Sequence, residues 1–267
     1  RSDAFLVALF LPEALRMTLA AGLLSAAALP LYQRRDTVSR QRWFDGLTPW
    51  VIATGLLVGA LLAVASPLWT RLIGPGLDDA AQQQAAASLR LLALCAPGLL
   101  LHAWLSIPLQ ARERFFLAGL GSLLFNLPPV LLLALGGGAS TPEQLALACV
   151  LGSLLMPLAL VPTSYGLGWR PWRWRGERDS GRELLRQIGP LLASNAASQG
   201  LALLERLMAS LLGEGAVTWV NLARKLINLP LIALMALNQV LLGMMSARAG
   251  GERLPLLRRG LSASTLL

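Results

Sequence analysis

Long apolar stretches are the feature of this sequence that most limits its possible folds. A helix needs about 20 residues to cross a hydrocarbon core about 30 Å thick. Seven segments of the 267-residue chain meet that length: about 4–32, 46–71, 89–110, 115–136, 143–167, 188–212 and 216–246. Only 14% of the residues are charged, against about a quarter in soluble domains. The sequence therefore predicts an all-α polytopic membrane protein with seven transmembrane helices.

Prolines interrupt many of these segments, and they indicate kinked helices. In a membrane bundle, neighbouring helices and water can satisfy the carbonyl groups that a proline frees. No low-complexity linker divides residues 1–267, so we predict a single transmembrane helical bundle. The chain opens without an initiator methionine and stops as a new apolar run begins, so we expect a fragment of a longer protein. The prolines concerned are Pro12, Pro49, Pro97, Pro108, Pro128, Pro129, Pro157, Pro162 and Pro230.

Arginine residues are concentrated in alternate loops, and this predicts how the chain is oriented. They collect in loops 33–43, 111–114, 168–187 and 247–260. Because basic residues gather in cytoplasmic loops, these four loops are predicted to be cytoplasmic, with residue 1 outside and the C-terminus inside. The loops predicted on the other side hold Arg1, Arg71 and Arg90 together with Asp78, Asp79, Glu143 and Glu214.

The loop 168–187 alternates tryptophan with arginine. We predict that Trp169, Trp172 and Trp174 lie in the headgroup region and that the arginines lie near anionic lipid. The alternative is that this loop receives a phosphate-bearing headgroup of a substrate arriving from the cytoplasm.

Four basic residues, Arg16, Arg206, Arg224 and Lys225, lie inside the predicted spans. A charge at membrane depth costs roughly 2.5–3.5 kcal/mol on insertion scales, so such a residue usually faces a watery cavity or a polar partner. Arg16 follows Asp3 by thirteen residues, which is about 20 Å of helix, too deep for easy snorkelling. Glu13 stands one turn before Arg16 and is predicted to pair with it.

Polar residues accompany these cations at helical spacing. In the segment 218–239, Asn221, Lys225, Asn228 and Gln239 are predicted to share one helical face. In the segment 188–212, a polar stripe is formed by Ser194, Asn195, Ser198 and Gln199. Either neighbouring helices neutralise the cations and fix packing, or the cations bind an anion. Since few carboxylates match them, we favour an anionic ligand, and arginine favours phosphate.

No pattern expected of an active site competes with this interpretation. Cys95, Cys149 and His102 lie in apolar segments without ligand spacing, so we predict buried or cavity-facing roles for them. The sequence contains no Ser–His–acid set, glycine-rich phosphate loop or paired carboxylate site. We therefore predict that the protein is not an enzyme and holds no metal or cofactor. A nucleic-acid partner is disfavoured because the net charge of +9 sits in short loops between spans.

Three stretches of the chain resemble the MurJ/MviN family, the lipid II flippases of the MOP transporter superfamily. The opening stretch is similar to the family's second helix, and RERFFLAGLGSLLFN resembles a family run through Arg114, Phe115 and Asn126. The opening matches are Asp3, Ala4, Phe5, Ala8, Leu11, Pro12, Leu15, Arg16, Gly22, Ser25 and Pro30. The third stretch matches through Gln187, Gly189, Pro190, Ser198, Gln199, Ala209, Ser210, Gly215, Val217, Ala223, Leu226 and Pro230.

This resemblance implies a bundle of MOP type, with fourteen helices in two lobes around a central cationic cavity. The chain would supply about helices 2 to 8, without the first helix and most of the C-terminal lobe. The family moves an undecaprenyl-pyrophosphate-linked glycan outward across the bacterial inner membrane by alternating access. The drive is membrane potential or an ion gradient, so a coupling ion of unknown identity is possible. Envelope-synthesis enzymes are possible partners beside the substrate and the bilayer.

The resemblance also implies which residues form the cavity. Asp3 and Arg16 match family positions important for function, and Lys225 stands where the family usually has an arginine. Arg224 replaces an acidic residue of the family pattern, and Ala21 replaces a glutamate. The resulting candidates for substrate binding are Arg16, Lys225, Arg224 and Arg206. The supporting polar set is Asp3, Glu13, Ser25, Asn195, Ser198, Gln199, Asn221 and Asn228.

Three other functions are compatible with the same residues. The departures from the family pattern favour a MviN-like paralogue that flips a lipid-linked exopolysaccharide unit. A MATE-like exporter of small cationic drugs would need carboxylates facing the cavity, for which Glu13 and Glu205 are the candidates. A non-transporting scaffold of an envelope-synthesis complex would not need the cavity charges. An enzyme acting on a lipid-linked sugar is disfavoured because no acid–base pair is present.

Overall fold

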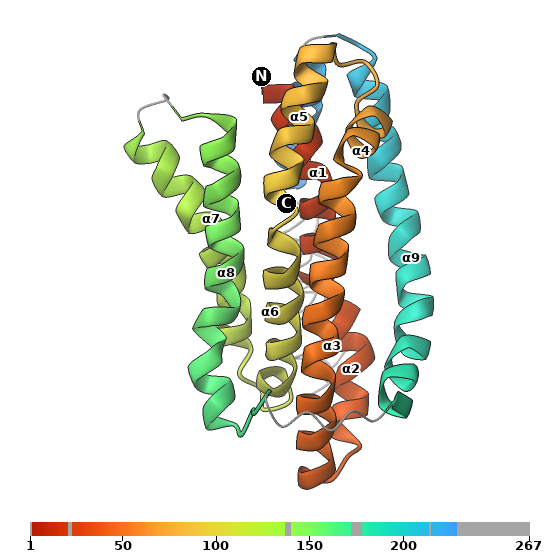
Figure 1. Ribbon diagram of the computed structural model, residues 1–267, viewed down its shortest axis with the longest axis vertical. Helices are drawn as coiled ribbons and strands as arrows, with labels where there is room; N and C mark the ends of the chain where they lie inside the picture. The colour runs from red at the N-terminus through yellow and green to blue at the C-terminus, as the bar shows by residue number, and fades with distance from the viewer. Residues whose placement is uncertain (1, 21–22, 137–139, 172–177, 214, 229–267) are drawn as a thin grey trace, which may run out of the picture. The chain divides into compact units, whose positions relative to one another are not determined.

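The computed structural model describes residues 2–20, 23–136, 140–171, 178–213 and 215–228, and these residues form helices and short connections (Figure 1). The helices are α1 Ser2–Ala20, α2 Leu23–Gln33, α3 Thr37–Val64, α4 Ser66–Ile73, α5 Asp79–Leu92, α6 Cys95–Gln110, α7 Phe115–Leu135, α8 Pro142–Gly166 and α9 Arg178–Ser210. Residues 216–228 are also helical. The chain divides into two compact units, Arg1–Glu214 and Gly215–Leu267. That residues 1–267 form a single bundle stays a prediction.

Within the described residues, five helical stretches are long and apolar enough to cross a membrane: Ser2–Gln33, Thr37–Val64, Asp79–Gln110, Phe115–Leu135 and Pro142–Gly166. They overlap the first five predicted segments. The all-helical class and the polytopic character are thus confirmed, although the predicted span 46–71 is divided at Ala65 into α3 and α4.

The last two predicted spans are not among the five apolar stretches found in the described residues. The sixth, 188–212, lies mostly in α9, a 33-residue helix that is not among the five apolar stretches. Charged residues in its first turns and the polar stripe near its middle lower its apolar character. The seventh predicted span, 216–246, is described only as far as residue 228.

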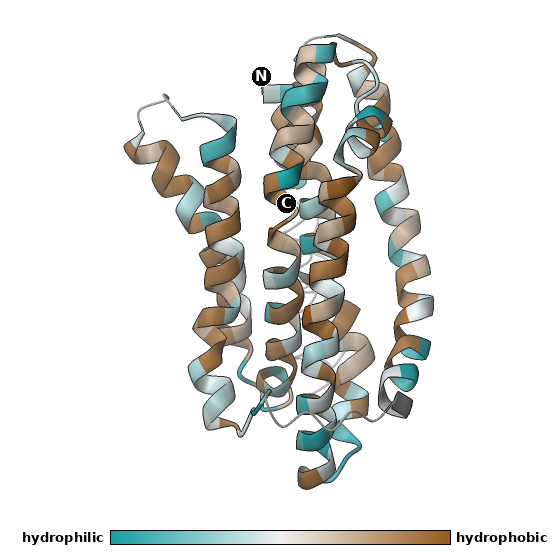
Figure 2. Ribbon diagram, viewed as in Figure 1, coloured by the Kyte–Doolittle hydropathy of each residue, from teal (hydrophilic) through white to brown (hydrophobic). Residues whose placement is uncertain are grey.

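The helix α6 forms the centre of the first unit. It packs against α1, α2, α3, α7 and α8, and Figure 1 shows it between α3 and α8. In the most apolar window of Asp79–Gln110, 72% of the residues are buried, against 11% in α7. Leucines are exposed along α3, α7 and α8, where a bilayer would cover them. Figure 2 shows long hydrophobic stretches on these helices. Because α6 is surrounded by other helices, its side chains point into the interior of the bundle.

Two helix crossings combine a glycine with a carbonyl group that a proline has freed. A Cβ atom at Gly152 of α8 would collide with the Phe125 carbonyl of α7, and Pro129 cannot donate to that carbonyl. A Cβ atom at Gly98 of α6 would collide with the Ser153 carbonyl of α8, four residues before Pro157. These glycines let the backbones of α6, α7 and α8 approach closely.

The predicted prolines mostly lie inside helices. Pro97 follows the break between α5 and α6, and Pro230 lies outside the described residues. The remainder of the predicted set is found within helices: Pro12, Pro49, Pro108, Pro128, Pro129, Pro157 and Pro162.

The predicted cytoplasmic loops that the structure describes lie at one end of the first unit. The turn between α2 and α3, the loop 111–114 and the segment after α8 are all at the lower end of Figure 1. Asp36 in the first of these caps α3, accepting from the backbone N–H groups of Val38 and Ser39 at 3.2 and 3.3 Å. Their position at the same end agrees with the prediction that these arginine-rich loops lie on one side of the membrane.

The segment that leaves α8 is bound to one face of α3. Gln41 donates to the Gly168 carbonyl, and buried Asp45 accepts from the Arg170 backbone N–H at 2.9 Å. Trp169 is only 8% exposed, so its predicted position among lipid headgroups is wrong. The reason is a hydrogen bond of its indole N–H to the buried Thr48 hydroxyl. Trp172 and Trp174 lie outside the described residues.

Candidate functional site

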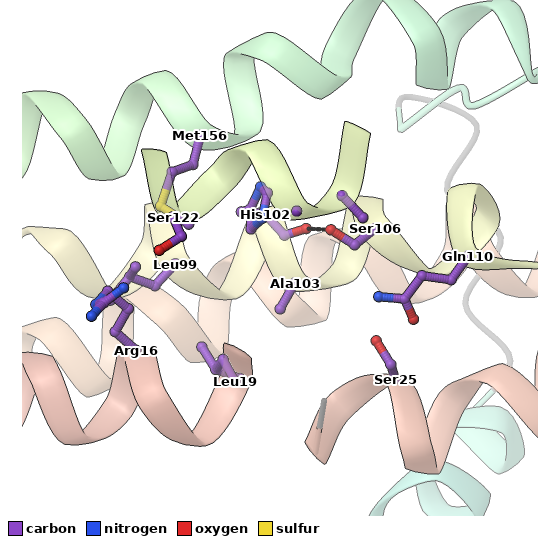
Figure 3. Close-up of a pocket in the computed structure, with 12 residues that line it drawn as sticks. Arg16, Leu19, Ser25, Leu99, His102, Ala103, Ser106, Gln110, Ser122 and Met156 are labelled. Atoms are coloured by element: carbon purple, nitrogen blue, oxygen red, sulfur yellow. Dashed lines mark hydrogen bonds between the residues drawn. The ribbon is translucent and has the colours of Figure 1, made fainter. Parts of the chain in front are cut away.

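A cavity of about 240 Å³ lies between α1, α2, α6, α7 and α8 (Figure 3). The central position of α6 explains why that helix supplies the largest share of the lining. In Figure 3, Arg16 lies toward one end of the cavity and Gln110 toward the other, with Ser25 facing Gln110. The lining residues are Arg16, Leu19, Ser25, Leu99, His102, Ala103, Ser106, Gln110, Ala118, Gly119, Ser122 and Met156.

Arg16 is the basic side chain that lines this cavity, and it is held from two sides. Its Nε and Nη2 atoms donate to the two carboxylate oxygens of Glu13 at 2.9 and 2.6 Å. Its guanidinium carbon lies 5.0 Å from the centroid of the Phe125 ring, an arrangement that favours a cation. The predicted pairing of Glu13 with Arg16 is confirmed. The charge of Arg16 is therefore balanced by a carboxylate in this state.

A polar face of α6 continues the site away from Arg16. His102, Ser106 and Gln110 follow at four-residue spacing, so they lie on one side of the helix. Ser106 donates to the His102 carbonyl at 2.8 Å, and the buried His102 Nδ1 has no hydrogen-bond partner among the described residues. The predicted cavity-facing role of His102 is confirmed. The site thus offers hydroxyl, amide and imidazole groups beside one guanidinium.

The sequence-based prediction missed three polar lining residues, Ser106, Gln110 and Ser122. The four-residue spacing from His102 was a usable signal for the first two. Ser122 came with no comparable signal, because it lies on α7 and reaches the cavity only through the packing of α7 on α6 and α8.

Asp3 of α1 and the predicted residues of α9 are not among the residues that line the cavity. Arg206 donates to the Leu6 carbonyl at 2.7 Å, and its guanidinium carbon lies 4.7 Å from the Phe10 ring centroid. Arg206 is therefore packed on α1 and is not among the residues that line the cavity. Asp3 is buried, and Asn195 and Gln199 are half-buried. The side chain of Ser198 lies outside the described residues, and substrate roles for this group stay predictions.

The predicted residues of the second unit lie on the helix 216–228. Asn221, Arg224 and Asn228 are half-buried, whereas Lys225 is exposed. Spacings of three and four residues place positions 221, 224 and 228 on one side of this helix. This less exposed side therefore includes Arg224 and not Lys225, the residue that the prediction had emphasised. Gln239 lies outside the described residues. That these side chains meet Arg16 in one cavity stays a prediction.

Potential metal ligands do not cluster in the described part of the chain, where no group of three or more His, Cys, Asp or Glu side chains could hold an ion. Cys95 and Cys149 are buried as free thiols.

Comparisons with known proteins identify relatives along the whole chain. The family model described as lipid II flippase MurJ matches residues 1–267. A probable lipid II flippase MurJ of Helicobacter pylori is 26% identical over 263 residues, covering 86% of this chain and 54% of the relative. The corresponding protein of Haemophilus influenzae is 29% identical over 250 residues, covering 86% of this chain and 48% of the relative.

A solved structure has the same fold. The lipid II flippase MurJ in an inward closed conformation superposes with a TM-score of 0.75 at 18% identity, covering 85% of this chain and 48% of that chain. The present chain spans about half the length of the relatives it matches. Proteins of this family are flippase transporters of the inner membrane and not enzymes. Since the family model covers every residue, the chain belongs to the lipid II flippase MurJ family.

Proposed function

We propose that this chain is part of a flippase that moves an undecaprenyl-pyrophosphate-linked glycan, such as lipid II, from the cytoplasmic to the outer leaflet. The observation that carries this proposal is Arg16, a guanidinium in a polar cavity between apolar helices. Relatives described as probable lipid II flippases support the same substrate class. Alternating access is the expected mode, in which two lobes rock around a fixed site.

Arginine suits the pyrophosphate group of such a substrate. Its planar guanidinium presents N–H donors in a fork that matches two phosphate oxygens, and charge-assisted bonds of this kind are strong. The hydroxyl and amide groups of Ser25, Ser106 and Gln110 are suited to polar parts of the headgroup. A cavity of about 240 Å³ is smaller than the sites that enclose drug-sized ligands, so it suits the diphosphate and not the whole glycan.

Further contacts are proposed from the second unit and from α9. Lys225 and Arg224 would supply additional positive charge to the diphosphate, with Asn221 and Asn228 beside them. Asp3, Asn195, Ser198 and Gln199 would support the polar wall of a larger central cavity. In this arrangement the cations come from separate helices, so that a relative movement of the helices would change the affinity for the anion.

The proposed location is the bacterial inner membrane, with the arginine-rich loops in the cytoplasm. Residue 1 would then lie outside and the C-terminus inside. Loading from the cytoplasm and release outside would be driven by membrane potential or by an ion gradient. Enzymes of envelope synthesis are proposed as partners because they produce and consume such substrates.

A second candidate substrate is a lipid-linked exopolysaccharide unit. Arg224 favours it, because a basic residue stands there in place of the acid of the family pattern. A reversal of charge next to the cationic position would alter the preference for the groups that flank the diphosphate.

Complementation tests the proposal. The full-length gene is expressed in cells depleted of their own lipid II flippase, as wild type and as Arg16→Ala. We expect growth to be restored by the wild type and not by Arg16→Ala at equal protein level. The matched control is Arg71→Ala, which removes an exposed arginine of α4 that does not line the cavity, and this variant should restore growth.

The results separate the candidates. Full activity of Arg16→Ala at normal protein level would refute the role of this cavity. Failure of the wild type to restore growth, together with restored polysaccharide export in a strain lacking its exopolysaccharide flippase, would favour the second substrate.

A further inference from the structure

One of the two donor edges through which Arg16 could bind a phosphate is occupied by Glu13. The two bonds, 2.9 Å from Nε and 2.6 Å from Nη2, use one edge of the guanidinium and both carboxylate oxygens. A carboxylate and a phosphate bind this edge in the same bidentate geometry. The two ligands are therefore mutually exclusive at that edge, and a phosphate that used it would have to displace Glu13.

The contact of Arg16 with Phe125 does not depend on Glu13. The guanidinium carbon lies 5.0 Å from the Phe125 ring centroid, and this contact uses the face of the guanidinium and leaves its N–H edges available. Phe125 is buried, at 5% exposure, and belongs to α7. The contact with Phe125 of α7 can therefore hold the Arg16 guanidinium in place when a phosphate replaces the Glu13 carboxylate.

The two partners differ in exposure. The Arg16 side chain is 13% exposed and lines the cavity, whereas the Glu13 side chain is 33% exposed and is not among the lining residues. Glu13 is thus the less buried partner, and Arg16 is the partner that an anion in the cavity can contact.

The pair also explains how a guanidinium is tolerated among apolar helices. An unpaired charge among apolar helices is costly, and removing one partner of a buried ion pair is strongly destabilising. Glu13 removes that cost when no anion is bound. A bound diphosphate would remove it equally well.

We propose that Glu13 is an internal ligand of Arg16 that competes with the diphosphate of the transported lipid and thereby sets the affinity of the site. This inference rests on the proposed function, since it assumes an anionic substrate at Arg16. In this scheme Glu13 is an affinity-determining residue. It returns to Arg16 when the substrate leaves, so that release is assisted by a group of the protein itself.

The test is a binding measurement with inorganic pyrophosphate on the full-length protein in lipid nanodiscs. Glu13→Gln keeps the size of the side chain and removes its charge. We expect the Kd of pyrophosphate to fall about tenfold, which corresponds to about 1.4 kcal/mol, because the anion no longer has to displace a charged carboxylate from Arg16. Arg16→Ala should lose binding, and the double variant should bind no better than Arg16→Ala.

Two further variants keep the test decisive. Glu143→Gln removes the same charge from an exposed position in the first turn of α8 and should leave the Kd unchanged. Glu13→Asp keeps the charge but shortens the side chain, so its carboxylate reaches Arg16 less well and the Kd should fall by a smaller factor. This variant carries the test if Glu13→Gln does not fold, as judged from its thermal unfolding midpoint.

The outcomes separate the two proposals. Unchanged or weaker binding by Glu13→Gln, with binding still lost in Arg16→Ala, overturns the role of Glu13 and leaves the flippase site intact. Wild-type affinity in Arg16→Ala instead removes the anchor of the proposed function. An equal gain in Glu143→Gln would show a general effect of charge and would also overturn the internal-ligand role.

Discussion

The indole nitrogen of Trp169 lies 3.2 Å from the hydroxyl oxygen of Thr48, and this hydrogen bond joins the segment after α8 to the middle of α3. The same hydroxyl accepts from the Trp104 indole at 3.0 Å and donates to the Phe44 carbonyl at 2.8 Å. A hydroxyl offers one donor and two acceptor positions, so all of them are used. Thr48 is fully buried, and three elements meet at its side chain.

Replacing Thr48 with valine should therefore be costly. Valine keeps the shape of the side chain but leaves two buried indole N–H groups without an acceptor, at roughly 1–3 kcal/mol each. We expect a clear drop in the thermal unfolding midpoint of the purified protein in detergent. The control is Thr54→Val on the same helix, because the Thr54 hydroxyl is exposed and bonds only to its own helix at Trp50. Equal drops for both variants would contradict the role of the three-way contact.

The close approach of α7 and α8 gives a second prediction. In Gly152→Ala the added methyl group meets the Phe125 carbonyl, so the helices must separate, and overpacking of this kind costs about 1–3 kcal/mol. Gly200→Ala in α9 meets nothing within 4 Å and should be neutral or should stabilise the helix by about 0.5–1 kcal/mol. Thermal unfolding of the two variants measures the difference, and similar midpoints would show that the crossing is not tightly packed.

The cap of α3 predicts a pH dependence. Hydrogen bonds from Ser39 and then Val38 lower the pKa of the Asp36 carboxyl in the folded protein. Its ionised form therefore stabilises the fold above the unfolded pKa of about 3.9, and this contribution is lost as the pH falls through the lower folded value.

Asp36→Asn keeps an effective helix cap without a titrating group. We expect the unfolding midpoint of this variant to depend less on pH than that of the wild type below about pH 4, when both are scanned from pH 6 to pH 3. Parallel pH profiles would show that the cap does not contribute to acid stability.

Arg206 provides a test between packing and substrate binding. Its guanidinium bonds to Leu6 and lies over the Phe10 ring, so we expect Arg206→Ala to lower the unfolding midpoint while the Kd of pyrophosphate stays within twofold of the wild type. The comparison is Arg16→Ala, which should lose pyrophosphate binding. A loss of affinity in Arg206→Ala at an unchanged midpoint would instead support the substrate role predicted from the sequence.

Much of the architecture was predictable because it depends on local patterns. Apolar length predicted seven spans, and the first five correspond to helical stretches long and apolar enough to cross a membrane. The spacing of Glu13 and Arg16 predicted their ion pair. Both partners lie on one turn of one helix, so their contact requires no knowledge of the rest of the fold. The family resemblance was readable for the same reason, since it depends on the order of residues along each helix.

The cavity and the burial of Trp169 required the tertiary structure. An amphipathic indole is stable either among lipid headgroups or in a core that supplies an acceptor, and the acceptor here is Thr48, 121 residues away. Ser122 reaches the cavity only through the packing of α7, and Arg206 is held by a carbonyl of α1, 200 residues away in the chain. The sequence alone determined that the chain forms apolar helices and which residues pair within a turn. Packing decided which polar side chains share a cavity, because that depends on contacts between helices far apart in the chain.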